Sequence, residues 1–172
     1  VRDAAAAFAS ATTRHTDLAV HVGTGPAVPV DALAQALVEG ILLTRYRYDP
    51  LKTGDRDPAV TALTVVTDAG QHEEALAGAE RGRSFALAGG LSRDLANGPP
   101  AHMTASRMGE IAQALGAERG FGVEVFDRDQ LVELGCGGLL GVNGGSVEEP
   151  RMIKLTYRPD GTGDDTPHLG LV

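Results

Sequence analysis

The chain has 172 residues, of which 42% are hydrophobic and 22% are charged, a composition typical of folded globular proteins and unlike that of disordered segments. Its 15 lysine and arginine residues against 23 aspartate and glutamate residues give a net charge of −8, which argues against a nucleic-acid partner because phosphate binding needs a basic surface. No apolar run approaches the ~20 residues of a membrane span, so we expect no membrane partner. No signal peptide is recognisable at the start, and the single cysteine, Cys136, suits a reducing compartment such as the cytoplasm.

The first part of the chain alternates predicted helices and strands, which is the pattern of an α/β fold. Apolar residues recur there at helical or at alternating spacing, and clusters of glycine, proline and aspartate separate these segments. The predicted elements, in chain order, are a helix at Val1–Ala11, a strand at Asp17–Val22, a helix capped by Asp31 and reaching Leu42, a loop at Tyr46–Pro58 and a strand at Thr61–Thr67.

A long helix is predicted from His72 to Ala96. Four glycines interrupt its pattern, and each costs roughly 1 kcal/mol relative to alanine in a helix interior, so close packing against another element is the expected reason for them. Asn97-Gly98-Pro99-Pro100 ends the helix and marks the predicted domain boundary. The glycines are Gly78, Gly82, Gly89 and Gly90, and the larger side chains fall within one broad stripe made of Leu76, Ala79, Arg83, Leu87, Leu91 and Leu95.

After the boundary the alternation continues with shorter elements. Thr104 is expected to cap a helix, and Asp127 with Gln130 has the spacing of a capping box. The predicted elements are a helix through Met108 and Leu115, a strand at Val123–Phe126, a short helix that stops at Gly135, a glycine-rich segment at Gly135–Gly145, a strand at Arg151–Tyr157, an acidic loop at Pro159–Thr166 and the first half of a strand at His168–Val172.

Motifs that bind dinucleotides or phosphates, or that position a catalytic serine, are incomplete. Gly23-Thr24-Gly25 and Gly135-Cys136-Gly137 lack the third glycine of the dinucleotide fingerprint, and Lys52-Thr53 does not open a helix. Ser84 and Ser146 each have a glycine two residues before but none two residues after. From its residues alone, the sequence predicts no self-contained catalytic constellation.

Residue types that bind metals are present without the spacing of metal ligands. Adjacent acidic side chains at Asp164-Asp165 and Glu148-Glu149 point apart on an extended chain, which makes them poor chelators. Asp127 and Asp129 could ligate, but capping explains Asp127 more simply. No two histidines fall four residues apart, as the two-histidine metalloprotease motif requires; they are His15, His21, His72, His102 and His168.

Four further features have a structural interpretation beside a functional one. Cys136 is a packed thiol or a nucleophile, and His102 orders the turn after Pro100 or acts in catalysis. Arg93 complements a helix end and Asp94 pairs with a neighbour. Asn143–Ser146 forms a tight turn between strands or an anion-binding nest. In each case the structural interpretation is the simpler one.

One stretch is more specific. The residues from Arg93 to Thr104 (RDLANGPPAHMT) resemble the interdomain segment of the cytosolic leucine aminopeptidase family. Val123–Val125 followed by Asp127, the glycine-rich run ending at Gly145-Ser146 and Glu149-Pro150-Arg151 are similar to later motifs of that family in the same order. Upstream, Glu39-Gly40, Tyr46–Asp49 and Lys52 resemble its E-G and Y-x-F-D-x-Y-K patterns, whereas Ala101, Ala105 and Cys136 depart from the usual residues.

The resemblance implies a two-domain α/β protein. Residues 1–70 would be part of a macro-like N-terminal domain, residues 71–98 a linker helix, and residues 99–172 the first elements of a mixed-sheet catalytic domain. The family removes N-terminal residues, leucine and other apolar ones by preference, from peptide substrates. It uses two divalent metal ions, manganese or zinc with magnesium as a further candidate, and is generally a cytoplasmic homo-hexamer.

The same resemblance places the metal ligands and catalytic groups in motifs that follow the strand matched by His168–Val172. We therefore expect no catalytic, metal-binding or substrate-binding residue and no bound metal in this chain, which looks like an internal piece that is inactive alone. Two alternatives stay open: a non-catalytic macro-like module that binds a nucleotide-type ligand, and an unrelated enzyme with Cys136 as nucleophile.

Overall fold

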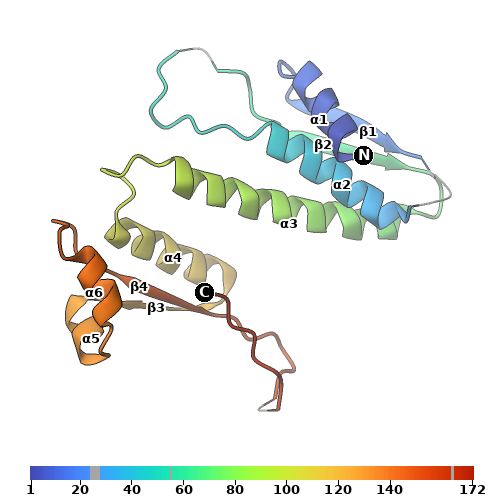
Figure 1. The fold of residues 1–172 in the computed structure, drawn as a ribbon. Helices are drawn as coiled ribbons and strands as arrows, with labels where there is room; N and C mark the ends of the chain where they lie inside the picture. The colour runs from blue at the N-terminus through green and yellow to red at the C-terminus, as the bar shows by residue number, and fades with distance from the viewer. Residues whose placement is uncertain (24–27, 55, 164) are drawn as a thin grey trace. The chain divides into compact units, whose positions relative to one another are not determined.

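The computed structural model describes residues 1–23, 28–54, 56–163 and 165–172. They form two compact units, Val1–Asn97 and Gly98–Val172, which we call the first and the second unit. Each unit combines helices with a two-stranded sheet, so the predicted α/β class is confirmed (Figure 1). No helix in the described ranges is both long and apolar enough to cross a lipid bilayer.

The first unit is built around a parallel pair of strands. Strand β1 pairs with β2 from Asp17 beside Ala62 to Val22 beside Thr67, and the predicted strand at Asp17–Val22 is confirmed at both ends. The elements of this unit are α1 (Arg2–Ala11), β1 (Asp17–Val22), α2 (Val30–Thr44), β2 (Ala62–Thr67) and α3 (His72–Asn97). Two buried apolar clusters fill it: Ala5, Ala9, Leu18 and Ile41 form one, and Val22, Val30, Ala34 and Ala75 form the other.

Helix α2 begins earlier than predicted. Pro29, with φ of −57°, is its N-cap, and the Pro29 carbonyl oxygen accepts the first helical hydrogen bond from Leu33. The prediction that Asp31 caps this helix is therefore wrong. The Asp31 carboxylate instead pairs with the Arg81 guanidinium of α3 at 2.6 Å, and this hydrogen bond is the main cause that lowers the pKa of Asp31.

Helix α3 packs on α2 through its smallest side chains. Its buried residues are Ala75, Gly78, Gly82 and Ala86. A Cβ atom at Gly78 would collide with the backbone of Asp31, and one at Gly82 would lie 2.6 Å from the Gln35 carbonyl oxygen. The expectation that close packing explains these two glycines is confirmed.

A similar close approach joins α1 to α2. A Cβ atom at Gly40 would lie 2.8 Å from the Ala5 Cβ and 2.9 Å from the Arg2 carbonyl oxygen. The neighbouring Glu39 is only 7% exposed; its carboxylate forms an ion pair with Arg2 at 2.7 Å and accepts a hydrogen bond from the Gln35 amide at 2.8 Å. The Glu39-Gly40 pair thus has a structural role. Gly40 leaves room for α1 to approach, and Glu39 binds Arg2 of α1.

The second unit contains an antiparallel pair of strands, in which Gly122 lies beside Thr156 and Phe126 beside Met152. The predicted N-cap at Thr104 and the capping box of Asp127 and Gln130 are both confirmed. The elements of this unit are α4 (Ala105–Arg119), β3 (Gly122–Phe126), α5 (Arg128–Glu133), α6 (Gly137–Asn143) and β4 (Met152–Thr156).

Helix α4 approaches β3 closely, and glycine again makes the contact possible. A Cβ atom at Gly116 would lie 2.5 Å from a methyl group of Val123, and one at Gly109 would lie 3.1 Å from a methyl group of Val125. Val123 and Val125 are two residues apart on β3, so their side chains lie on the same face of the strand, the face toward α4. Leu131 of α5 is 0% exposed and completes the interior of this unit.

Two predictions for the second unit are wrong. The glycine-rich segment contains a helix, α6, so Asn143–Ser146 connects a helix to β4 and is not a turn between strands. At the start of α6 the Leu140 amide donates to the Cys136 carbonyl oxygen at 3.1 Å, so the segment forms helical hydrogen bonds despite the poor helix propensity of glycine. His168–Val172 is not in a strand. The sheet of this unit consists of β3 and β4, and no described strand pairs with His168–Val172.

The α2–α3 contact yields a stability prediction. We expect Gly78→Ala to lower the free energy of unfolding by about 1–3 kcal/mol, because its methyl group must displace the α2 backbone, despite the roughly 1 kcal/mol that alanine gains over glycine in a helix. Gly90→Ala is the matched control, since its Cβ would meet Tyr46 at an ordinary 3.7 Å. Urea denaturation followed by circular dichroism measures both, and unchanged or higher stability of Gly78→Ala would contradict the packing.

Candidate functional site

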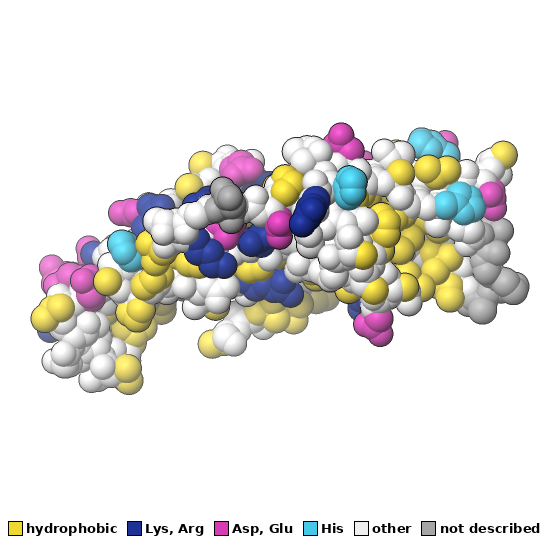
Figure 2. Space-filling view, turned by 90° about the horizontal axis from the view of Figure 1, so that it is seen from above, with side chains coloured by type: hydrophobic (Ala, Val, Ile, Leu, Met, Phe, Trp, Pro, Cys, Tyr) yellow, Lys and Arg dark blue, Asp and Glu magenta, His cyan; other side chains and the backbone are white. Residues whose placement is uncertain are grey.

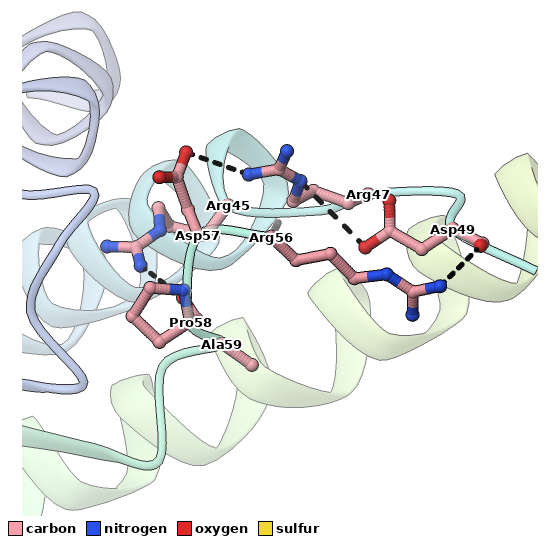
Figure 3. A pocket seen from close by; sticks show the side chains of 7 residues that line it. All are labelled: Arg45, Arg47, Asp49, Arg56, Asp57, Pro58 and Ala59. Atoms are coloured by element: carbon pink, nitrogen blue, oxygen red, sulfur yellow. Dashed lines mark hydrogen bonds and ion pairs between the residues drawn. The ribbon is translucent and has the colours of Figure 1, made fainter. Parts of the chain in front are cut away.

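A hollow of about 410 Å³ lies in the first unit, on the loop that follows α2. Figure 3 shows that charged side chains of both signs surround it. The lining residues are Arg45, Arg47, Asp49, Arg56, Asp57, Pro58 and Ala59. The sequence predicted this loop but gave no indication of a hollow, because the lining residues meet only when the loop folds back on itself.

The arginines of this hollow bind the chain itself. Arg47 pairs with the Asp57 carboxylate at 2.9 Å, and Arg56 donates to the backbone carbonyl oxygens of Asp49 and Lys52 at 3.3 and 2.9 Å. Arg45 donates to four backbone carbonyl oxygens, those of Thr12, Thr13, His15 and Pro58. These bonds hold the loop in shape, and an incoming anion would have to displace them.

Asp49 has one oxygen that is less well satisfied. Its Oδ1 is buried and accepts no hydrogen bond from the described residues, and the nearest cation, Lys52 Nζ, is 3.9 Å away. Its Oδ2 lies 3.9 Å from Arg47 Nε. The Asp49 carboxylate therefore has two cations nearby, Arg47 and Lys52, each at 3.9 Å. Such an arrangement is more typical of the interior of a loop than of a ligand-binding site.

Tyr46 fastens the end of α2 to the end of α3. Its hydroxyl donates to Asp94 Oδ1 at 2.8 Å and accepts from Asn97 Nδ2 at 3.2 Å. The Arg93 guanidinium lies over the Tyr46 ring, 5.3 Å from its centre, and donates to the Leu43 carbonyl oxygen at 2.8 Å. We call Tyr46, Arg93, Asp94 and Asn97 the tyrosine clamp.

The clamp explains Arg93 and Asp94 without catalysis. Arg93 does complement a negative helix end, but the end it binds is that of α2, because Leu43 lies in the last turn of that helix. Burial, followed by the neighbouring Asp94 carboxylate, raises the pKa of the Tyr46 phenol, and Asn97 and Arg93 oppose that rise. The tyrosine therefore stays a neutral donor at physiological pH.

The other residues that the sequence singled out, as far as the structure describes them, do not assemble into a site. Cys136 is half-buried at the N-cap of α6, and within the described ranges no hydrogen bond or ion pair joins its thiol to a basic side chain. Asp127 caps α5. His102 lies in the turn after Pro100, where its amide donates to the Pro99 carbonyl oxygen at 2.8 Å. His21 lies 3.5 Å from Asp68, and both side chains are exposed.

The described residues do not bring together any group of three or more histidine, cysteine, aspartate or glutamate side chains that could hold a metal ion. Asp164 of the predicted acidic pair, and Thr24 and Gly25 of the first glycine motif, lie outside the described residues. On the face shown in Figure 2, basic and acidic side chains are intermingled and do not form a patch of one sign. The two divalent ions implied by the resemblance do not fit the donors described here.

Comparison with known proteins identifies the chain. Residues 90–172 match the model of the cytosol aminopeptidase family, catalytic domain. A probable cytosol aminopeptidase of Solibacter usitatus is 42% identical over 139 residues, and one of Chlorobaculum tepidum is 39% identical over 145 residues. The chain belongs to the cytosol aminopeptidase family. These alignments cover 81% and 79% of the chain but only 28% and 29% of the two relatives.

Solved structures agree with this family. The bottromycin maturation enzyme BotP in complex with Mn matches with a TM-score of 0.81 and 31% identity, over 92% of this chain and 33% of BotP. A tomato leucine aminopeptidase mutant has the same fold over 94% of the chain, with a TM-score of 0.81 and 17% identity. The aminopeptidase interpretation is therefore favoured over a non-catalytic macro-like module.

The match to the family model begins at residue 90, inside α3. It includes three residues of the clamp, Arg93, Asp94 and Asn97, but not Tyr46. The resemblance had pointed to both segments, Tyr46–Asp49 and Arg93–Asn97, as separate motifs. No helical or strand periodicity could have shown that they bind each other, because 48 residues separate Tyr46 from Asp94 along the chain.

The clamp yields a prediction on alkaline stability. Because Tyr46 has a higher pKa in the folded chain than the ordinary 10.0, the folded state binds this proton more tightly, and its contribution to stability is present below pH 10.0 and lost as pH rises above it. We expect Tyr46→Phe to remove that part of the alkaline loss. Denaturation curves at a series of alkaline pH values measure this, with Tyr157→Phe, on an exposed tyrosine, as control.

A titration of tyrosinate absorbance tests the same point directly. The difference between the wild-type and Tyr46→Phe curves should show a midpoint above 10.0. A midpoint at or below the ordinary value would contradict the clamp as described.

Proposed function

We propose that this chain is part of a metallo-aminopeptidase that removes N-terminal residues, leucine and other apolar ones by preference, from peptides. The observation that carries the proposal is the match of residues 90–172 to the cytosol aminopeptidase catalytic domain. The two relatives, both named probable cytosol aminopeptidases, support it over a longer stretch of the chain.

The chemistry rests on groups that the described residues do not supply. Two divalent ions, manganese or zinc with magnesium as a further candidate, would activate a water molecule and polarise the scissile carbonyl. The similar BotP structure is a complex with Mn, which favours manganese. Because the described residues form no cluster of metal-binding side chains, we assign no catalytic, metal-binding or substrate-binding role to any of them.

The role we propose for these residues is structural. Residues 1–70 would belong to the N-terminal domain, residues 71–98 to the linker helix, and residues 99–172 to the start of the catalytic domain. The α2–α3 contact and the tyrosine clamp would hold the linker helix, from which the chain enters the catalytic domain. We place the whole enzyme in the cytoplasm as a homo-hexamer.

The 172-residue chain alone should be inactive. We expect it to release no chromophore from leucyl-p-nitroanilide with manganese or zinc added, because the described residues bring together no group of three or more metal-binding side chains. The complete protein encoded by the gene should hydrolyse the same substrate with either metal and stop when a chelator is added.

The control is the complete protein with residues 1–172 unchanged, assayed in the same buffers. Metal-dependent hydrolysis by the short chain would refute the assignment of its residues to a scaffold. Absence of hydrolysis by the complete, folded and metal-loaded protein would refute the aminopeptidase itself.

A further inference from the structure

One face of α3 is left open beside the face that packs on α2. Leu76, Glu80, Arg83 and Leu87 follow one another at spacings of four, three and four residues, so they lie along one side of the helix. All four are exposed, and the two leucines keep 48% and 49% of their surface in solvent. We call these four residues the α3 open face.

The two charged side chains on this face have no polar partner in the part of the chain that the structure describes. Glu80 and Arg83 lie one helical turn apart, yet among the described residues neither side chain forms an ion pair or a side-chain hydrogen bond. By contrast, the neighbouring Arg81 points to α2, where it binds Asp31 at 2.6 Å and Gln35 at 3.3 Å. The α3 open face therefore offers an acid, a base and two leucines together.

The order of these four residues is self-complementary. Leu76 and Leu87 lie equally far from the midpoint between Arg81 and Gly82, and so do Glu80 and Arg83. A second α3 helix laid antiparallel about that midpoint places leucine opposite leucine at both ends and Glu80 opposite Arg83 twice in the middle. A two-fold axis brings the same patch of both copies together. If one residue of the first copy contacts a different residue of the second, the reverse contact also forms, so the patch must be complementary to itself.

We propose that the α3 open face binds a second copy of this chain, with the two α3 helices antiparallel about a two-fold axis. This contact rests on the homo-oligomer part of the proposed function and is independent of hydrolysis. Four residues on each helix make a smaller contact than a stable interface of about 1,200–2,000 Å² needs. The short chain should accordingly self-associate weakly, and in the complete protein the contact would add to others.

Charge reversal tests the pairing. Glu80→Arg and Arg83→Glu should each place like charges opposite each other twice, and each should weaken dimerisation of the chain about tenfold in sedimentation equilibrium, equivalent to about 1.4 kcal/mol. The double variant Glu80→Arg/Arg83→Glu restores opposite charges and should return the dissociation constant to near the wild-type value. Glu74→Arg, an equal change of charge at another exposed position of α3, should leave it unchanged.

The leucines are tested in the same assay. Leu87→Asp should abolish the dimer, whereas Ala88→Asp, at the adjacent exposed residue, should not. A cysteine pair captures an association too weak for sedimentation: in a Cys136→Ser background, Leu76→Cys/Leu87→Cys should form a disulfide-linked dimer under mild oxidation faster than Ala77→Cys/Ala88→Cys. Circular dichroism confirms that each variant is folded.

Three results would overturn the proposal. They are equal cross-linking of the two cysteine pairs, a dimer that the single charge reversals do not weaken, and a double reversal that does not restore it. No metal or peptide enters these measurements, so their failure leaves the aminopeptidase proposal standing. Conversely, a finding that the complete protein is inactive would not contradict the proposed contact between two α3 helices.

Discussion

The first unit depends on how closely the backbones of α2 and α3 approach. At Gly78 and Gly82 even one methyl group would meet the backbone of the facing helix. This approach brings Ala75 into the apolar cluster with Val22 and Ala34, so the sheet and both helices share one interior. It also brings Arg81 within reach of Asp31 and Gln35. The polar contacts at the edge of the interface therefore follow from the small residues at its centre.

The same constraint determines what remains exposed on α3. Because glycine and alanine occupy the α2-facing side, the larger side chains Leu76 and Leu87 lie on a neighbouring face, where they are available to other surfaces. Near the C-terminal end of α3, the tyrosine clamp makes the contact with α2 and the residues that follow it. There Arg93 donates to the last turn of α2, and the Tyr46 hydroxyl donates to Asp94. Two chemically different contacts thus hold one long helix, one by close approach and the other by hydrogen bonds and charge.

Local signals in the sequence were sufficient for most elements. The alternating Asp17–Val22, the cap at Thr104 and the capping box at Asp127 depend on neighbours in the chain, and each is confirmed. Asp31 was misassigned because its partner, Arg81, is 50 residues away and competes for the carboxylate. Helix α6 was missed because its glycines have poor helix propensity, and the hollow near Arg45 depends on the path of a whole loop. For function, the motif from Arg93 to Thr104 was informative, while composition and periodicity only excluded alternatives.

The central claim is that α2 and α3 form one cooperative element through their backbone contact. Native-state hydrogen exchange tests it most directly, since amides that open together exchange with one free energy. We expect the amides around Gly78 and Gly82 and those of α2 around Gln35 to share the slowest exchange of the first unit, and to lose protection together as urea is added. Fast exchange of α3 while α2 stays protected would contradict the account.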